Sequence, residues 1–370
     1  MTINTIILKN FLSEENKIYL FGITTHFYNN YKLYGGRMKS YDIRNYDNGI
    51  GRVKKGSKFE YYYIKTNKII DKKDLDRINK LKIPPMWSEV WVSINPKSNI
   101  QAVGVDNKGR KQYRYHEQHI KDAEKNKFLK LIDFIKALPK IDNIIKLHKQ
   151  KEIYSKYRVI TIMLSLVRLL HIRVGKEQYA RENKSYGLCS LKKKHVKINK
   201  DLLTLNFKGK SNQRLNYTIK NKYLKSQIEL LLNLGGEKLF QYIDENDNIK
   251  KITDSDLNNY IQEFMGENFT MKDFRTYAAN YHFIEDLIKE TIKHKPKTET
   301  IKKKNILNAL KKTAHHLRHT RNISKKSYVM NFCIDLYKSN PKYFITNQDN
   351  NIDNILLDIL KQYKKNILHL

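Results

Sequence analysis

The chain has 370 residues, of which 40% are hydrophobic, and its 72 Lys and Arg against 37 Asp and Glu give a formal net charge of +35. This length and apolar content are enough for two ordinary domains with cores of their own. The charge excess indicates a polyanionic partner, for which nucleic acid is the first choice. A lysine-rich coding bias is the alternative cause of the charge.

Membrane and disulfide classes are not favoured. The N-terminus lacks the basic start and apolar core of a signal peptide, and no apolar run reaches the length of a membrane span. Cys189 and Cys333 are too few for a disulfide framework and do not belong to a metal-type cluster. We expect both thiols to be reduced and structural, with no metal, no cofactor and no membrane partner. The protein is expected to be soluble and intracellular, or packaged in a particle, with nucleus or cytoplasm left open.

Residues 1–57 mix short apolar pieces with glycines, a pattern typical of turns between short strands. The pieces are Ile6–Leu8 and Tyr19–Ile23, and the glycines are Gly35, Gly36, Gly49 and Gly51. This part carries no recognisable chemistry and is interpreted as an extension.

The next stretch is predicted to form a helix and then strands. The helix covers residues 73–81 and is stopped by Pro84 and Pro85. Strands are predicted for residues 90–94, 100–105 and 110–115, with a tight turn at Lys108 and Gly109 before the last one.

The strand at 110–115 interleaves basic and aromatic residues. Alternation places Arg110, Gln112 and Arg114 on one face and Lys111, Tyr113 and Tyr115 on the other. Such a strand can contact the sugar–phosphate backbone and bases of a nucleic acid, although the same pattern is usual in a solvated edge strand.

Residues 126–370 are predicted to be mostly helical. A charged helix over 126–137 should end before Pro139, and an amphipathic helix is predicted over 152–172. Residues 195–219 indicate a hairpin or three-stranded meander. Further helices are predicted over 222–234, 254–265, 271–290, 306–317, 324–337 and from 352 to the C-terminus, with a charged connector over 293–304.

Five basic or tyrosyl residues in this region are candidate site residues. Arg173 follows a predicted helix, Lys210 lies on a glycine-containing turn, and Arg275 lies in the first turns of the helix over 271–290. His319 precedes Tyr328 by nine positions. Each alone has an ordinary structural reading: a cation at a helix C-terminus, a solvated loop lysine, a core histidine, or one of 25 tyrosines.

Together these residues lie in motifs that resemble those of type IB DNA topoisomerases. Residues 324–328, Ser-Lys-Lys-Ser-Tyr, resemble the Ser-Lys-x-x-Tyr signature, and the nine-residue spacing from His319 is that of the family. Residues 272–276 resemble its Lys-Asp-x-Arg-Thr motif, residues 172–176 its first Arg motif, and residues 207–210 its Lys-bearing hairpin. The resemblance runs from about residue 82 to the C-terminus and is strongest to the small poxvirus, giant-virus and bacterial enzymes.

The resemblance implies an α+β fold, with a small mainly-β N-terminal domain and a larger, mostly α-helical catalytic domain of the topoisomerase IB/tyrosine recombinase type with a β-hairpin. We place the DNA-binding domain at residues 1–125, including the extension, and the catalytic domain at 126–370. The implied activity is relaxation of positive and negative supercoils by transient single-strand cleavage, strand rotation and religation, without ATP or metal. The implied partner is duplex DNA, clamped by a monomer.

The same resemblance assigns roles to residues. Tyr328 attacks phosphorus to give a 3′-phosphotyrosyl bond, and Arg173, Arg275 and His319 hold the non-bridging oxygens. Lys210 protonates the leaving 5′ oxygen, with Arg173 as the other candidate acid. Ser211 stands where the family often has an acidic residue, so an acidic partner of the lysine stays open. The DNA-binding residues are predicted to be Lys108, Arg110, Tyr113, Tyr115, Tyr179 and Lys272.

Two alternatives remain. Residues 315–320 resemble the His-x-Leu-Arg-His-Thr motif of tyrosine recombinases, but Arg318 is only ten positions before Tyr328, whereas recombinases place that Arg tens of residues upstream. The other alternative is a non-catalytic, basic DNA-packaging protein for which charge alone matters.

Overall fold

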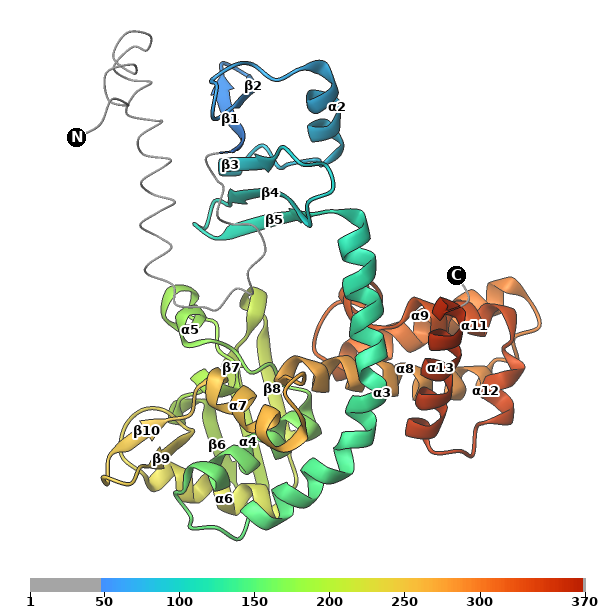
Figure 1. Cartoon of the computed structure of the whole chain (residues 1–370). Helices are drawn as coiled ribbons and strands as arrows, with labels where there is room; N and C mark the ends of the chain where they lie inside the picture. Colours follow the sequence, from blue (N-terminus) through green and yellow to red (C-terminus); the bar gives the residue numbers. More distant parts are fainter. Residues whose placement is uncertain (1–47, 369–370) are drawn as a thin grey trace. The chain divides into compact units, whose positions relative to one another are not determined.

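The computed structural model describes residues 48–368 (Figure 1), so the apolar pieces and the first glycine pair of the expected extension lie outside the described residues. The chain divides into two compact units between Glu124 and Lys125. The architecture, a sheet-rich first unit and a mostly helical second unit with small sheets, is the expected α+β fold.

The first unit is built on a five-stranded antiparallel sheet in the order β2-β1-β3-β4-β5. The three strands predicted from the sequence are present, each within two residues of the expected bounds. The elements are β1 (Gly49–Lys55), β2 (Lys58–Tyr63), α2 (Lys72–Lys80), β3 (Ser88–Ser93), β4 (Ile100–Val105) and β5 (Lys111–Tyr115).

The turn expected at Gly49 and Gly51 is wrong, because both glycines lie inside β1. A Cβ on Gly49 would lie 1.9 Å from Nε1 of Trp91, and one on Gly51 would lie 2.5 Å from Cζ of Tyr62. The glycines therefore make room for aromatic rings on the neighbouring strands, a use of glycine inside strands that composition alone does not distinguish from a turn.

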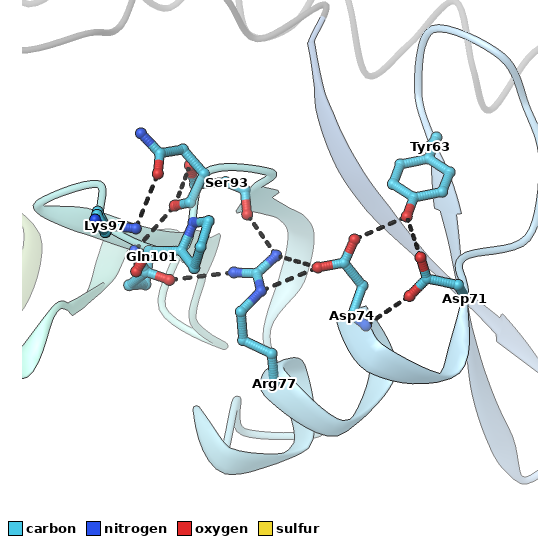
Figure 2. Close-up of polar contacts among 9 residues, drawn as sticks. Tyr63, Asp71, Asp74, Arg77, Ser93, Lys97 and Gln101 are labelled. Atoms are coloured by element: carbon cyan, nitrogen blue, oxygen red, sulfur yellow. Dashed lines mark hydrogen bonds and ion pairs between the residues drawn. The ribbon is translucent and has the colours of Figure 1, made fainter.

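Helix α2 is joined to the sheet through Arg77 (Figure 2). Its Nη2 donates to the Ser93 carbonyl at 2.8 Å and its Nη1 to Gln101 Oε1 at 3.1 Å. Asp74 Oδ1 accepts from Arg77 Nε at 3.1 Å, while Asp74 Oδ2 accepts from the Tyr63 hydroxyl at 2.7 Å. One half-buried ion pair thus connects α2 to strands β2, β3 and β4.

The second unit begins within α3 (Glu117–His148), and the expected helix end before Pro139 is wrong. A proline inside a helix costs ~3 kcal/mol, whereas each fully buried large apolar side chain contributes roughly 1.5–3 kcal/mol. Helix α3 buries apolar residues on both sides of the proline, so packing outweighs the local penalty. These residues are Phe128, Leu131, Phe134, Ile135, Leu138, Ile141 and Ile145.

The predicted meander is confirmed as the antiparallel sheet β6-β7-β8, with β6 (Val196–Asn199), β7 (Leu202–Lys208) and β8 (Arg214–Ile219). The strands β9 (Gln241–Ile243) and β10 (Ile249–Lys251) form a separate pair that the sequence did not indicate. The remaining helices are α4 (Lys156–Leu170), α5 (Glu177–Asn183), α6 (Lys222–Asn233), α7 (Asp254–Met265), α8 (Met271–Lys293), α9 (Glu299–His316), α10 (Arg321–Ile323), α11 (Asn331–Ser339), α12 (Lys342–Thr346) and α13 (Ile352–Leu368).

Two expectations near the C-terminus need correction. The connector expected over 293–304 is shorter, because Thr298 caps α9 by accepting from the Ile301 amide at 3.3 Å. The single helix expected over 324–337 is instead a π-helical turn, Ser324–Tyr328, followed by extended backbone and then α11.

Helix α8 lies at the centre of this unit. It packs against α7, α9, α12 and α13, and the side chains of its middle are buried on most sides. Phe274 meets Phe134 of α3 edge to face, with ring centroids 5.0 Å apart.

Cys189 and Cys333 are buried free thiols, as expected. Among the described residues, no helix is long and apolar enough to cross a membrane.

Candidate active site

The first turn of α8 is held in place by Asp273. Its Oδ2 accepts from the Thr270 amide at 2.8 Å, which closes a capping box, and its Oδ1 pairs with Lys130 of α3 at 2.7 Å. The negative charge of this carboxylate also interacts favourably with the positive end of the helix dipole at the N-terminus of α8. This fixed turn carries the exposed Lys272, and the buried Arg275 follows two positions after Asp273.

Arg275 is 6% exposed and is gripped by two backbone carbonyls. Its Nη1 donates to the His171 carbonyl and its Nη2 to the Leu317 carbonyl at 2.9 Å. Burial, followed by the charge of Arg173, lowers the pKa of the guanidinium. Within residues 48–368 no carboxylate pairs with it, and Nε has no hydrogen-bond partner. A buried cation without a counter-charge is costly, so this site is built for an anion.

Arg173 follows α4 after a left-handed cap at His171, whose φ is 51°. Its backbone is fixed by the Leu188 amide, which donates to the Arg173 carbonyl at 2.9 Å. Gly175 has φ +73°, and a Cβ there would lie 2.6 Å from the Gly187 Cα, so only glycine fits. The Arg173 guanidinium donates to the Arg318 carbonyl at 3.3 Å.

Tyr328 ends the π-helical turn, in which the Val329 amide donates to the Ser324 carbonyl at 2.9 Å. Asn280 of α8 clamps the chain just beyond it. The Asn280 Nδ2 donates to the Tyr328 carbonyl at 3.0 Å, and its Oδ1 accepts from the Met330 amide at 2.9 Å. π-Turns recur at functional sites, and here the turn sets the direction of the tyrosine ring.

The Tyr328 ring lies in a cationic environment. Arg275 Cζ is 5.7 Å from the ring centroid. Burial alone would raise the pKa of the Tyr328 hydroxyl, but the charges of Arg275, Arg173 and Lys272 outweigh it and the pKa is lowered. The hydroxyl is therefore easier to deprotonate than an ordinary tyrosine, whose pKa is about 10.

His319 completes the group, with its ring centroid 5.0 Å from that of Tyr328. Burial, and then the charges of Arg275 and Arg173, lowers the pKa of His319 to about 4. Its Nε2 lies 2.7 Å from Ser324 Oγ, and its buried Nδ1 has no hydrogen-bond partner among the described residues. A neutral imidazole of this kind can donate one hydrogen bond to a ligand oxygen without adding charge.

The structure thus brings together Arg173, Arg275, His319 and Tyr328 from four separate segments. Lys210 is exposed in the short 3-10 turn between β7 and β8. Across the described part of the chain, no hydrogen bond or ion pair joins its ammonium to the other four side chains.

The remaining predicted DNA contacts are surface residues. Tyr179 of α5 is 46% exposed, and Lys272 is exposed at the start of α8. On β5 the expected alternation holds, because Tyr113 and Tyr115 stack on one face with centroids 5.9 Å apart. Gln112 of β5 donates to Asp106 Oδ2 at 2.9 Å, and Arg110, just before the strand, donates to the same oxygen at 2.6 Å. Lys108 is exposed in the preceding turn, where its amide donates to Asp106 Oδ1 at 2.9 Å.

Sequence reasoning missed Asn280. Its only signal is a polar residue five positions after Arg275, inside a helix whose neighbouring positions are apolar or small.

Within residues 48–368, no cluster of His, Cys, Asp and Glu is arranged to hold a metal ion.

Comparison with known families defines the class. The eukaryotic DNA topoisomerase I catalytic core matches residues 109–344, and the bacterial DNA topoisomerase IB N-terminal domain matches residues 58–106. The chain therefore belongs to the DNA topoisomerase I family, as an enzyme of type IB. These matches favour the topoisomerase over the recombinase and packaging-protein alternatives.

Individual relatives of the chain support the same family assignment. The DNA topoisomerase 1B of Acanthamoeba polyphaga mimivirus is 53% identical over 333 residues, which cover 89% of this chain and 99% of the relative. The DNA topoisomerase 1B of vaccinia virus (strain Copenhagen) is 27% identical over 64% of this chain and 72% of its own length. The DNA topoisomerase 1 of Drosophila melanogaster is 26% identical over 51% of this chain, but only 17% of its own length is covered.

Proposed function

We propose that this protein relaxes positive and negative supercoils in duplex DNA by transient cleavage of one strand, rotation and religation. The observation that supports the proposal is the position of the Tyr328 ring, whose centroid lies 5.7 Å from Arg275 Cζ and 5.0 Å from that of His319. The charges of Arg275 and Arg173 also lower the pKa of its hydroxyl. The positive charge of these arginines stabilises both the attacking phenolate oxygen and the negative charge that develops on the phosphoryl oxygens.

In the proposed reaction the Tyr328 oxygen attacks phosphorus in line, a 3′-phosphotyrosyl bond forms, and the bond to the 5′ oxygen breaks. Arg173 and Arg275 would hold the non-bridging oxygens, because guanidinium groups donate two parallel hydrogen bonds to such oxygens. His319 would donate a further hydrogen bond as a neutral imidazole. Religation is the same step in reverse, with the 5′ hydroxyl as nucleophile.

Lys210 is proposed to give its proton to the leaving 5′ oxygen. Its exposed position on a short turn leaves the ammonium free to reach a bound strand, and Arg173 is the other candidate for the acid. The phosphodiester energy is retained in the phosphotyrosyl bond, so resealing requires neither ATP nor a metal ion.

Duplex DNA is proposed to contact both units. The net charge of +35 would neutralise many backbone phosphates. On β5, the stacked pair Tyr113 and Tyr115 is proposed to contact sugar and base edges, and Lys108 and Arg110, which come before the strand, are proposed to contact phosphates. In this proposal a monomer binds the duplex, and residues 1–125 and 126–370 close around it as a clamp.

The test is plasmid relaxation in EDTA and without ATP, on negatively and positively supercoiled circles. The wild-type protein should relax both, and Tyr328→Phe should relax neither while binding DNA with unchanged affinity. Tyr223→Phe is a matched control, because the buried Tyr223 hydroxyl has no hydrogen-bond partner within residues 48–368. DNA binding without relaxation by the wild-type protein would support the packaging role instead.

A further inference from the structure

The two carbonyls that grip Arg275 are both attached to a cluster of histidines. One is the carbonyl of His171 itself, and the other belongs to Leu317, the residue after His316. Between these two histidines lies His282, which is on α8 two turns after Arg275. We call His171, His282 and His316 the histidine ladder.

The contacts within the histidine ladder are close. His171 Nε2 and His282 Nε2 are 2.8 Å apart, and their rings meet at 65°. His282 Nδ1 lies 3.3 Å from Glu285 Oε2, and Glu285 Oε1 accepts from Lys289 at 2.7 Å. The ladder is therefore a chain of polar contacts from an exposed ion pair on α8 to the end of α4.

These contacts determine where the ladder's protons lie. A carboxylate only accepts, so the His282 Nδ1 facing Glu285 must carry a proton. In neutral His282 the Nε2 is then the acceptor, and the proton between the two rings belongs to His171 Nε2. The direction of donation is His171 to His282 to Glu285.

His316 stacks on His282, with ring centroids 4.1 Å apart and planes inclined at 12°. Its Nε2 faces Asp286 Oδ2 at 3.6 Å, an oxygen that is buried and has no hydrogen-bond partner in the described chain. This stack holds the end of α9 where the loop with Leu317 begins.

We propose that His282 is a positioning residue for Arg275: it fixes His171 through the shared hydrogen bond and His316 through the stack, and so aims the two carbonyls that hold the guanidinium. The inference rests on the proposed function, because it assumes that Arg275 holds the reacting phosphate. His282 itself does not touch the substrate; it acts through the backbone of its neighbours.

The groups around His171 and His282 favour neutral rings at these two positions. His282 is faced by Glu285 and Asp286 of α8, by His316 of α9 and by His171 after α4, whereas the charge of Arg275 acts on His171. Burial lowers the pKa of both inner histidines, His171 to about 3 and His282 in the same direction. A protonated pair would place two donors against each other and add charge beside the buried guanidinium.

The ladder can be tested with two variants at one position. His282→Phe keeps a stacked ring but removes both hydrogen bonds, whereas His282→Gln keeps an acceptor for His171. Single-turnover formation of the covalent protein–DNA adduct should slow roughly tenfold or more in His282→Phe, since a displacement of about 1 Å can cost about 10²-fold. His282→Gln should recover most of the rate, and DNA affinity should stay the same in both.

Arg275→Lys supplies the second test, because lysine cannot bind two carbonyls with a planar fork. In that background, adding His282→Phe should slow adduct formation no further. His148→Phe is the control for a purely structural loss, since His148 is also a buried histidine with a 2.7 Å bond, to Tyr260, in a separate aromatic cluster. It should lower thermal stability without changing the rate.

The outcomes are separable. Equal slowing by His282→Phe and His148→Phe, no recovery in His282→Gln, or a full additional loss in the Arg275→Lys background would each overturn the positioning role. A wild-type protein that forms no adduct would reject the proposed function itself, and the role of His282 with it.

Discussion

The side chain of Asn280 ties the Tyr328 segment to α8 through the two peptide units that flank Val329: it donates to the Tyr328 carbonyl at 3.0 Å and accepts from the Met330 amide at 2.9 Å. Asn280 is 1% exposed, so these bonds are shielded from water. Arg275 lies five positions earlier on the same helix, and one rigid element therefore positions both the tyrosine and its principal cation.

Replacing Asn280 should accordingly impair chemistry more than binding. Asn280→Ala leaves two buried backbone groups unpaired, at a cost of about 1–3 kcal/mol each in the stability of the folded segment. We expect slower covalent adduct formation with unchanged DNA affinity, measured by single-turnover cleavage and filter binding. Asn308→Ala serves as the control and should cleave normally. It removes a hydrogen bond from the Asn308 side-chain amide to Glu290, near the other end of α8.

Local sequence signals predicted the elements that carry the site. The helix over residues 254–265 and the β6-β7-β8 meander depend on neighbours in the chain, and the structure contains both. The helix end predicted at Pro139 was wrong, because the free energy gained by burying one face of α3 exceeds the local cost of a proline in the helix. The π-turn was missed because its extra residue is fixed by Asn280, a contact across 48 positions.

The site itself was predictable only through the family motifs. Taken singly, Arg173, Arg275 and His319 have ordinary structural readings, and only their order and spacing point to one site. The carbonyl grip on Arg275 and the histidine ladder carry no motif, because they arise where α4, α8 and α9 meet in space. The role of Lys210 still rests on the resemblance, since within residues 48–368 no hydrogen bond or ion pair joins its side chain to Arg173, Arg275, His319 or Tyr328.

The depressed pKa of His319 predicts how stability depends on pH. Its folded-state pKa is about 4, against 6.5 when unperturbed, so the unfolded chain binds more protons between these values. Stability from the neutral ring is therefore complete above pH 6.5 and is lost as the pH falls toward 4. His319→Gln should show a shallower loss over that window in chemical denaturation, and an identical slope would contradict a buried neutral His319.

Binding should weaken steeply as salt increases. Each phosphate neutralised releases counterions, so the logarithm of the affinity should fall linearly with the logarithm of salt concentration. Lys108→Ala should reduce the magnitude of the slope, because an ammonium is lost. Tyr113→Ala should leave the slope unchanged and alter the choice of cleavage site, since tyrosine neutralises no phosphate. A nearly flat plot for the wild-type protein would show that its charge of +35 does not act on the DNA backbone.

The last prediction separates Lys210 from the other cations. If Lys210 is the general acid, its loss slows cleavage because the 5′ oxygen must leave as an alkoxide. Loss of Arg275 or His319 slows cleavage for a different reason, the weaker stabilisation of the phosphoryl oxygens. For an arginine this loss is ~3–4 kcal/mol, by analogy with an oxyanion-hole donor. A 5′-phosphorothiolate strand offers a sulfur leaving group that needs no proton.

Cleavage of that strand should therefore be largely restored in Lys210→Ala, and much less in Arg275→Ala or His319→Ala. Tyr328→Phe should gain nothing, because it lacks the nucleophile whatever the leaving group. The exposed position of Lys210 makes the substitution neutral for folding, so a rate change reports on chemistry. Equal rescue of Lys210→Ala and Arg275→Ala would instead make Lys210 an electrostatic residue, and Arg173, which already reaches the loop carbonyl of Arg318, would be the acid to test next.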